Sequence, residues 1–168
     1  MKLFISADIE GVTGVTTWED TEPGKSSYNI YVKQMAREIS AACRAAIESG
    51  FDEIIVKDAH EDGTNVDMYA LPPEAVLVRG MMPSPYNMVE GVDEDCTAAV
   101  FIGYHSAAST AGSPLAHTFT SKKIFKMSIN DKIVSEYHLN ALVLAKLGIP
   151  LVFVSGDKGL CESVKSDN

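Results

Sequence analysis

Carboxylates and histidines stand at the ends of the apolar segments of this chain. Asp8 and Glu10 end the first segment, in MKLFISADIEG. They are two residues apart, so their side chains point to the same side while the chain stays extended. His60 ends a second segment, EIIVKDAH, and His105 ends a third, AAVFIGYH. Paired carboxylates and imidazoles at strand ends are suited to binding cations, and we expect a metal site where these ends meet.

Glu136 is the fifth candidate ligand. It lies in SEYH, in the first turn of an expected helix, where a carboxylate also favours the helix dipole. Two imidazoles and three carboxylates fit a pair of divalent ions with one carboxylate bridging them. Zinc fits this set best, while manganese, cobalt and iron use the same ligand types. A single Asp or His after a strand is more often a turn residue, so the prediction depends on the coincidence of five candidates.

Four other polar residues have less certain roles. Asp58 and Asp157 also end apolar segments, and we expect Asp58 to orient an imidazole and not to bind a metal directly. His138 lies two residues after Glu136 on the same helix, so we expect it on the surface or in packing. His117, in the loop sequence SPLAHTF, is the remaining candidate for chemistry. A neutral imidazole there could accept a proton from water, donate one to a leaving amine, or attack a carbonyl.

Strand and helix patterns alternate along the chain. Apolar residues recur at helical spacing from Met35 to Ala46, before Gly50, and again from about Ser135 to Leu147, before Gly148. The sequence 123–133 predicts a hairpin that turns at Asn130-Asp131. Besides the first segment, strands are expected at 53–57, 75–78, 97–102 and 151–154. This alternation predicts an α/β fold with three layers, a mostly parallel open sheet with helices on both faces, and active residues at the carboxyl ends of the strands.

Composition narrows the class of protein. The 168 residues are 46% hydrophobic and 22% charged, which fits one globular domain covering residues 1–168. The net charge of −9 argues against a nucleic-acid partner. The three cysteines are widely spaced and form no CxxC pair, so a reducing compartment is expected. No apolar run is long enough to cross a membrane and no leader pattern precedes the first strand, so we expect a cytoplasmic protein without a membrane partner.

Five motifs together resemble the DppA-type D-aminopeptidases, a family of zinc metallopeptidases. They are MKLFISADIEG, VKDAH, FIGYH followed by SAAST, AHTF, and INDKIVSEYHLNA, and the match continues in order to VSGD. The resemblance implies that Asp8 bridges two zinc ions and that Glu10 and His60 complete one site. It implies that His105 and Glu136 complete the other site, with His117 as the catalytic histidine.

The resemblance also implies an activity and an assembly. It implies removal of N-terminal D-amino acids from short peptides or amides, by a closed homo-oligomer. Family members continue well beyond the VSGD strand, so we expect a single α/β metallohydrolase domain that lacks the family's C-terminal region.

Two other functions remain open. One is a metal-dependent amidohydrolase or phosphoesterase of other specificity, although the loops after the ligand strands are poor in Lys and Arg for binding phosphate. The other is a module without activity that binds a structural ion.

Overall fold

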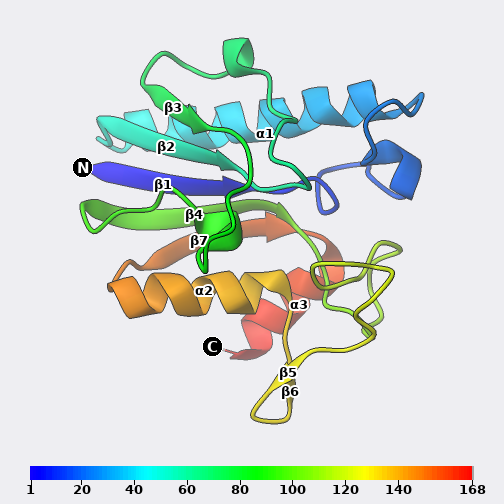
Figure 1. Cartoon of the computed structure of the whole chain (residues 1–168). Coiled ribbons are helices and arrows are strands. Elements are labelled where there is room, and N and C mark those ends of the chain that lie inside the picture. The colour runs from blue at the N-terminus through cyan, green and yellow to red at the C-terminus, as the bar shows by residue number, and fades with distance from the viewer. Residues whose placement is uncertain (168) are drawn as a thin grey trace.

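The computed structural model describes residues 1–167 and is built around one sheet of five strands, all of which pair in parallel (Figure 1). In order across the sheet, the strands are β3 (Ala75–Val78), β2 (Glu53–Asp58), β1 (Lys2–Ala7), β4 (Cys96–Tyr104) and β7 (Leu151–Gly156). Their carboxyl ends therefore share one edge, as the alternating pattern predicts.

Helices cover both faces of the sheet, which confirms the predicted three-layer α/β fold. Helix α1 (Tyr28–Glu48) lies on one face, and α2 (Glu136–Leu147) and α3 (Lys158–Asp167) lie on the other (Figure 1). The apolar stripe of α1 packs on alternate residues of β1, because successive strand side chains point to opposite faces. The intervening residues of β1 and β4 pack against α2 and α3.

The remaining elements are short and lie in the connections. They are three 3₁₀ turns and a small hairpin: η1 (Trp18–Asp20), η2 (Met68–Ala70), η3 (Asn87–Val89), β5 (Ser128–Ile129) and β6 (Lys132–Ile133). Asn130 and Asp131 form the predicted turn, with φ values of 50° and 66°. The hairpin is shorter than predicted, because only two residues pair on each side of that turn.

The ends of β1 and β4 approach so closely that their backbones touch. The N–H of Gly11 donates to the carbonyl of Gly103 over 2.8 Å. A Cβ at Gly11 would lie 1.8 Å from the carbonyl oxygen of Tyr104, and a Cβ at Gly103 would lie 2.2 Å from that of Asp8. Only glycine fits such spacing, and Gly103 also has a φ of 71°. This contact places the residues after β1 beside those after β4.

Cys43, Cys96 and Cys161 are free thiols. None of the helices within residues 1–167 combines the length and the apolar character that crossing a membrane requires.

Candidate metal centre

The six predicted site residues meet at the carboxyl edge of the sheet, although they come from five separate parts of the chain. All are at least 91% buried, with exposed fractions of 2%, 5%, 4%, 1%, 9% and 5% for Asp8, Glu10, His60, His105, His117 and Glu136. The loop after β1, the ends of β2 and β4, the loop after β4 and the first turn of α2 position them. Three buried carboxylates so close together require compensating positive charge.

His60 faces two carboxylates with a single ring nitrogen. Its Nδ1 lies 3.3 Å from Asp8 Oδ1 and 3.2 Å from Glu10 Oε2. Its Nε2 lies 3.0 Å from the carbonyl oxygen of Thr21. A carbonyl only accepts, so Nε2 carries a hydrogen and Nδ1 of the neutral ring is left as a ligand atom.

His105 is arranged in the same way on the other side of Asp8. Its Nε2 lies 3.5 Å from Asp8 Oδ2 and 3.4 Å from Glu136 Oε1, while its Nδ1 donates to the carbonyl of Ser106 over 3.0 Å. Among the described residues, neither His105 Nε2 nor Glu10 Oε2 has a hydrogen-bond partner, although both atoms are buried. The two carboxylate oxygens of Asp8 thus face different imidazoles, and unpartnered nitrogen and oxygen atoms point into the space between them.

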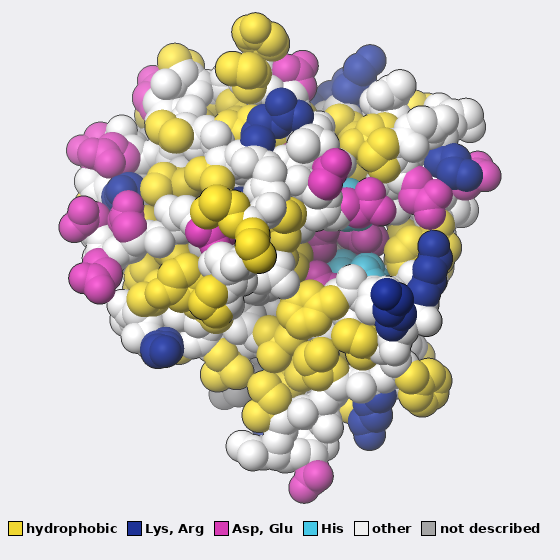
Figure 2. All heavy atoms as spheres, in the orientation of Figure 1, with side chains coloured by type: hydrophobic (Ala, Val, Ile, Leu, Met, Phe, Trp, Pro, Cys, Tyr) yellow, Lys and Arg dark blue, Asp and Glu magenta, His cyan; other side chains and the backbone are white. Residues whose placement is uncertain are grey.

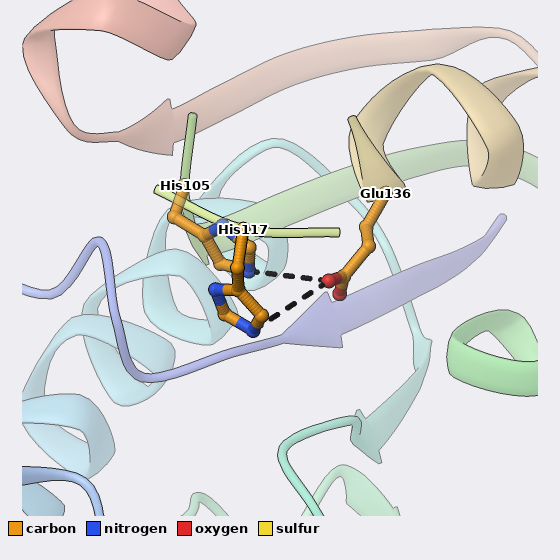
Figure 3. A group of neighbouring side chains, drawn as sticks. All are labelled: His105, His117 and Glu136. Carbon is orange, nitrogen blue, oxygen red and sulfur yellow. Dashed lines mark ion pairs between the residues drawn. The ribbon is translucent and has the colours of Figure 1, made fainter. Parts of the chain in front are cut away.

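His117 lies directly against this cluster. Its ring stacks on His105 at a centroid distance of 4.0 Å and an angle of 6°, and it makes a T-shaped contact with Trp18 at a centroid distance of 5.2 Å. Its Nδ1 donates to the carbonyl of Leu115 over 2.9 Å. Its Nε2 lies 3.8 Å from Glu136 Oε1 (Figure 3) and 3.9 Å from Glu10 Oε1.

Two groups of three residues have a geometry suited to holding an ion. Each group brings its ligand atoms within 4.8 Å of one another: Asp8, Glu10 and His60 in one group, and His105, His117 and Glu136 in the other. The second group includes His117, which the sequence analysis assigned to catalysis and not to metal binding. Imidazole and carboxylate ligands of this kind suit zinc.

The charges of the centre shift the protonation of its members. Burial alone would lower the pKa of His105, but the charge and hydrogen bonding of Glu136, together with the charges of Glu10 and Asp8, raise that pKa to about 10. Burial would likewise lower the pKa of His60, but Glu10 and Asp8 raise it well above its usual value. Burial and the negative charge of Asp8 raise the pKa of Glu10. Burial opposes ionisation of Asp8 too, but its hydrogen bond with His60 and the charge of His105 lower its pKa.

The predicted role of Asp58 is wrong. Within residues 1–167 its carboxylate has no hydrogen bond with an imidazole, and it instead accepts from the backbone N–H groups of Asn65 and Val66, at 2.6 and 2.7 Å, and from the Asn65 side chain at 2.9 Å. The Asn65 amide also donates to the carbonyl of His60 at 2.8 Å. Asp58 therefore fixes the turn that carries His60, through its hydrogen bonds with Asn65 and Val66.

Asp157 and His138 are also structural. Asp157 accepts from the N–H and hydroxyl of Ser106, at 2.6 and 2.5 Å, and from the N–H of Leu160 at the start of α3. It thereby fastens the residue after His105. His138 Nδ1 accepts from the N–H of Ser135 at 3.0 Å and caps α2 next to Glu136.

A cavity of about 560 Å³ opens over the cluster. Figure 2 shows acidic and histidine side chains at the bottom of a hollow, beside a group of hydrophobic side chains. Four large apolar residues line the cavity: Trp18, Met81, Met88 and Phe119. None of them was expected from the sequence, since they lie in the connecting segments, outside the periodic helix and strand patterns.

Comparison with known proteins supports one family. The family model described as D-aminopeptidase matches residues 1–168. The D-aminopeptidase of Bacillus subtilis (strain 168) is 36% identical over 157 residues, which cover 94% of this chain and 56% of that protein. A solved structure, the Zn-dependent D-aminopeptidase DppA from Bacillus subtilis, a self-compartmentalizing protease, has 34% identity and a TM-score of 0.89, and the match covers 99% of this chain and 60% of that one. The chain therefore spans about three fifths of the length of these relatives.

Proposed function

The chain belongs to the D-aminopeptidase family, and from this premise we propose that it is a zinc-dependent aminopeptidase that removes N-terminal D-amino acids from short peptides or amides. The observation that carries the proposal is the buried cluster of three carboxylates and three imidazoles at the bottom of an open cavity. The descriptions of both relatives as D-aminopeptidases, one of them zinc-dependent, support the substrate and the metal.

We assign two zinc ions to the centre. Asp8 would bridge them, because its two oxygens face the imidazoles of His60 and His105 separately. Glu10 and His60 would complete one site, and His105 and Glu136 the other. When bound, zinc supplies Lewis-acid polarisation of a carbonyl group and activation of water.

His117 is assigned the proton transfer or nucleophilic attack. The hydrogen bond from its Nδ1 to the Leu115 carbonyl leaves Nε2 of the neutral ring without a proton and directed at the cluster. Stacking on His105 and a T-shaped contact with Trp18 hold the ring of His117 in this position. A nitrogen so placed can take a proton at the reaction centre and return it to a leaving amine.

The cavity lining favours an acyl substrate with a free amino group. Glu22 and Glu61 line the cavity and offer negative charge to an ammonium group. Among the described residues that line the cavity, Lys122 is the only Lys or Arg. A single basic side chain is poorly suited to binding phosphate.

Assembly and location belong to the same proposal. A closed homo-oligomer is supported by the description of the solved relative as self-compartmentalizing. A cytoplasmic location is supported by the three free cysteines.

Metal analysis of purified variants tests the two-ion assignment. We expect about two zinc ions per chain in the parent protein. Asp8→Ala should lose most of both, since one carboxylate serves two sites, while Glu136→Ala should lose chiefly one. A full metal complement in Asp8→Ala would contradict the bridging role.

Hydrolysis of matched D-alanyl and L-alanyl amides tests the activity and the role of His117. We expect the D-amide to be cleaved at least tenfold faster, and His117→Ala to keep both zinc ions while kcat falls on the order of a hundredfold, the usual effect of losing an acid-base group. Loss of zinc from His117→Ala would make His117 a ligand. Equal rates for the two enantiomers would exclude a D-aminopeptidase, and rapid cleavage of a phosphoester would favour the phosphoesterase.

A further inference from the structure

Unusual backbone conformations surround the cavity. Six non-glycine residues in the described part of the chain have positive φ, and three of them, Glu61, Asn87 and Phe119, line the cavity. Phe119, with a φ of 58°, is the bulky one of these three. For a large side chain this left-handed conformation is a real outlier, and such residues concentrate at functional sites.

Hydrogen bonds hold the backbone at Phe119, and at the residue before it, in this conformation. Its N–H donates to Glu136 Oε1 over 2.6 Å. The preceding Thr118 is fully buried, and its hydroxyl donates to the carbonyl of Val134 and accepts from the N–H of Ala108. The backbone before and at Phe119 is therefore hydrogen-bonded to two other segments, one at Ala108 and one at Val134 and Glu136, which is the condition under which strain persists.

The Phe119 ring is only partly buried by the rest of the fold. It is 43% exposed, yet it lines the cavity that contains the buried cluster. Trp18, Met81 and Met88 line the same cavity. These apolar groups contribute nothing to holding a cation, but they offer a surface on which an apolar substrate side chain can pack.

We propose that Phe119 is a specificity-determining residue whose left-handed backbone, held by Glu136, presents its ring as the wall that receives the apolar side chain of the substrate's N-terminal residue. The inference rests on the proposed aminopeptidase function. Because the N–H of Phe119 belongs to the backbone, replacing its side chain leaves the hydrogen bond to Glu136 available and separates recognition from metal binding.

The first experiment compares a large and a small apolar substrate in Phe119→Ala, with Phe119→Leu as the conservative control. For Phe119→Ala we expect the ratio of kcat/KM for D-leucine amide to that for D-alanine amide to fall about fivefold, mainly through KM for D-leucine amide. Zinc content should match the parent, and Phe119→Leu should restore most of the ratio. An unchanged or increased ratio would overturn the proposal.

Calorimetric titration with D-leucine and D-alanine gives the same comparison without turnover. We expect Phe119→Ala to lose affinity for D-leucine and to keep its affinity for D-alanine. If the parent protein hydrolyses neither amide, the proposed function fails, while a selective loss of D-leucine binding still supports the wall. Equal losses for both amino acids would refute it.

The second experiment tests the backbone through thermal unfolding of Phe119→Gly and Phe119→Ala. Both remove the ring, but only glycine adopts a φ of 58° without strain. We expect the melting temperature of the Gly variant to exceed that of the Ala variant by about 3 °C. Ser121, in the same loop and with ordinary φ, is the control position, where Gly should be the less stable. If the Ala variant were the more stable one at Phe119 too, as expected at Ser121, the backbone of Phe119 would not be strained.

Discussion

Backbone carbonyls, and not carboxylates, orient the three imidazoles of the centre. The carbonyls of Thr21, Ser106 and Leu115 each bond one ring nitrogen and leave the other directed at the cluster. A carbonyl is a neutral acceptor, so it fixes each ring without adding negative charge to a site that already holds three carboxylates. These partners could not be predicted from the sequence, because every residue offers the same carbonyl group.

Zinc affinity should rise with pH at this centre. The neighbouring carboxylates raise the pKa of His60 and His105, so in the folded chain without metal both imidazoles are protonated on both nitrogens and positively charged at neutral pH. Zinc binds only neutral imidazole and must displace these protons, so affinity should increase about tenfold per pH unit for each proton released. Titration calorimetry at pH 6 and pH 8, in two buffers of different ionisation enthalpy, measures the zinc affinity and the number of protons released on binding. Affinity independent of pH would show that the rings are already neutral.

At the scale of elements, the turn after β2 is built around one buried carboxylate. Asp58 is fully buried and accepts three hydrogen bonds from Asn65 and Val66. The side-chain amide of Asn65 in turn donates a hydrogen bond to the carbonyl of His60. The position of one metal ligand therefore depends on a residue that does not touch it.

Replacing Asp58 should damage stability and one metal site together. Asp58→Ala leaves three donors without their acceptor, so we expect the free energy of unfolding to fall by about 3 kcal/mol or more. Zinc should be lost first from the site of His60. Urea unfolding and zinc analysis measure the two effects.

Asp62→Ala is the matched control for this change. Asp62 accepts from Thr64 in the same turn but is exposed, so its loss should cost under about 1 kcal/mol. Equal destabilisation by the two variants would contradict the special role of Asp58.

The elements that could be predicted from the sequence are those in which buried apolar residues recur at regular spacing. Helix α1 and the buried strands follow apolar spacing closely, and α2 ends at Gly148 as predicted. Helix α3 was not predicted, because only one face of a short and mostly polar segment is buried, around Leu160. The capping role of His138 was missed too, since the sequence gives its place on the helix but not the neighbouring N–H group.

For the whole molecule, the parallel sheet explains why the site could be predicted at all. Strand ends that are far apart in sequence must share one edge, so Asp8, His60 and His105 were expected together and are found within one cluster. The cavity wall could not be predicted in the same way. Trp18 and Phe119 lie in loops whose paths depend on contacts between distant segments, and no periodic pattern records such contacts.

The backbone contact between the ends of β1 and β4 limits how this chain can evolve. Gly11 and Gly103 perform no chemistry, yet any side chain at either position would overlap a carbonyl group of the opposite strand. Even substitution by alanine, the smallest change that adds a side chain, is therefore not tolerated at either position. In a library of all single substitutions, these two glycines should tolerate as few replacements as the metal ligands, and lineages descended from this sequence should keep them even where the substrate has changed.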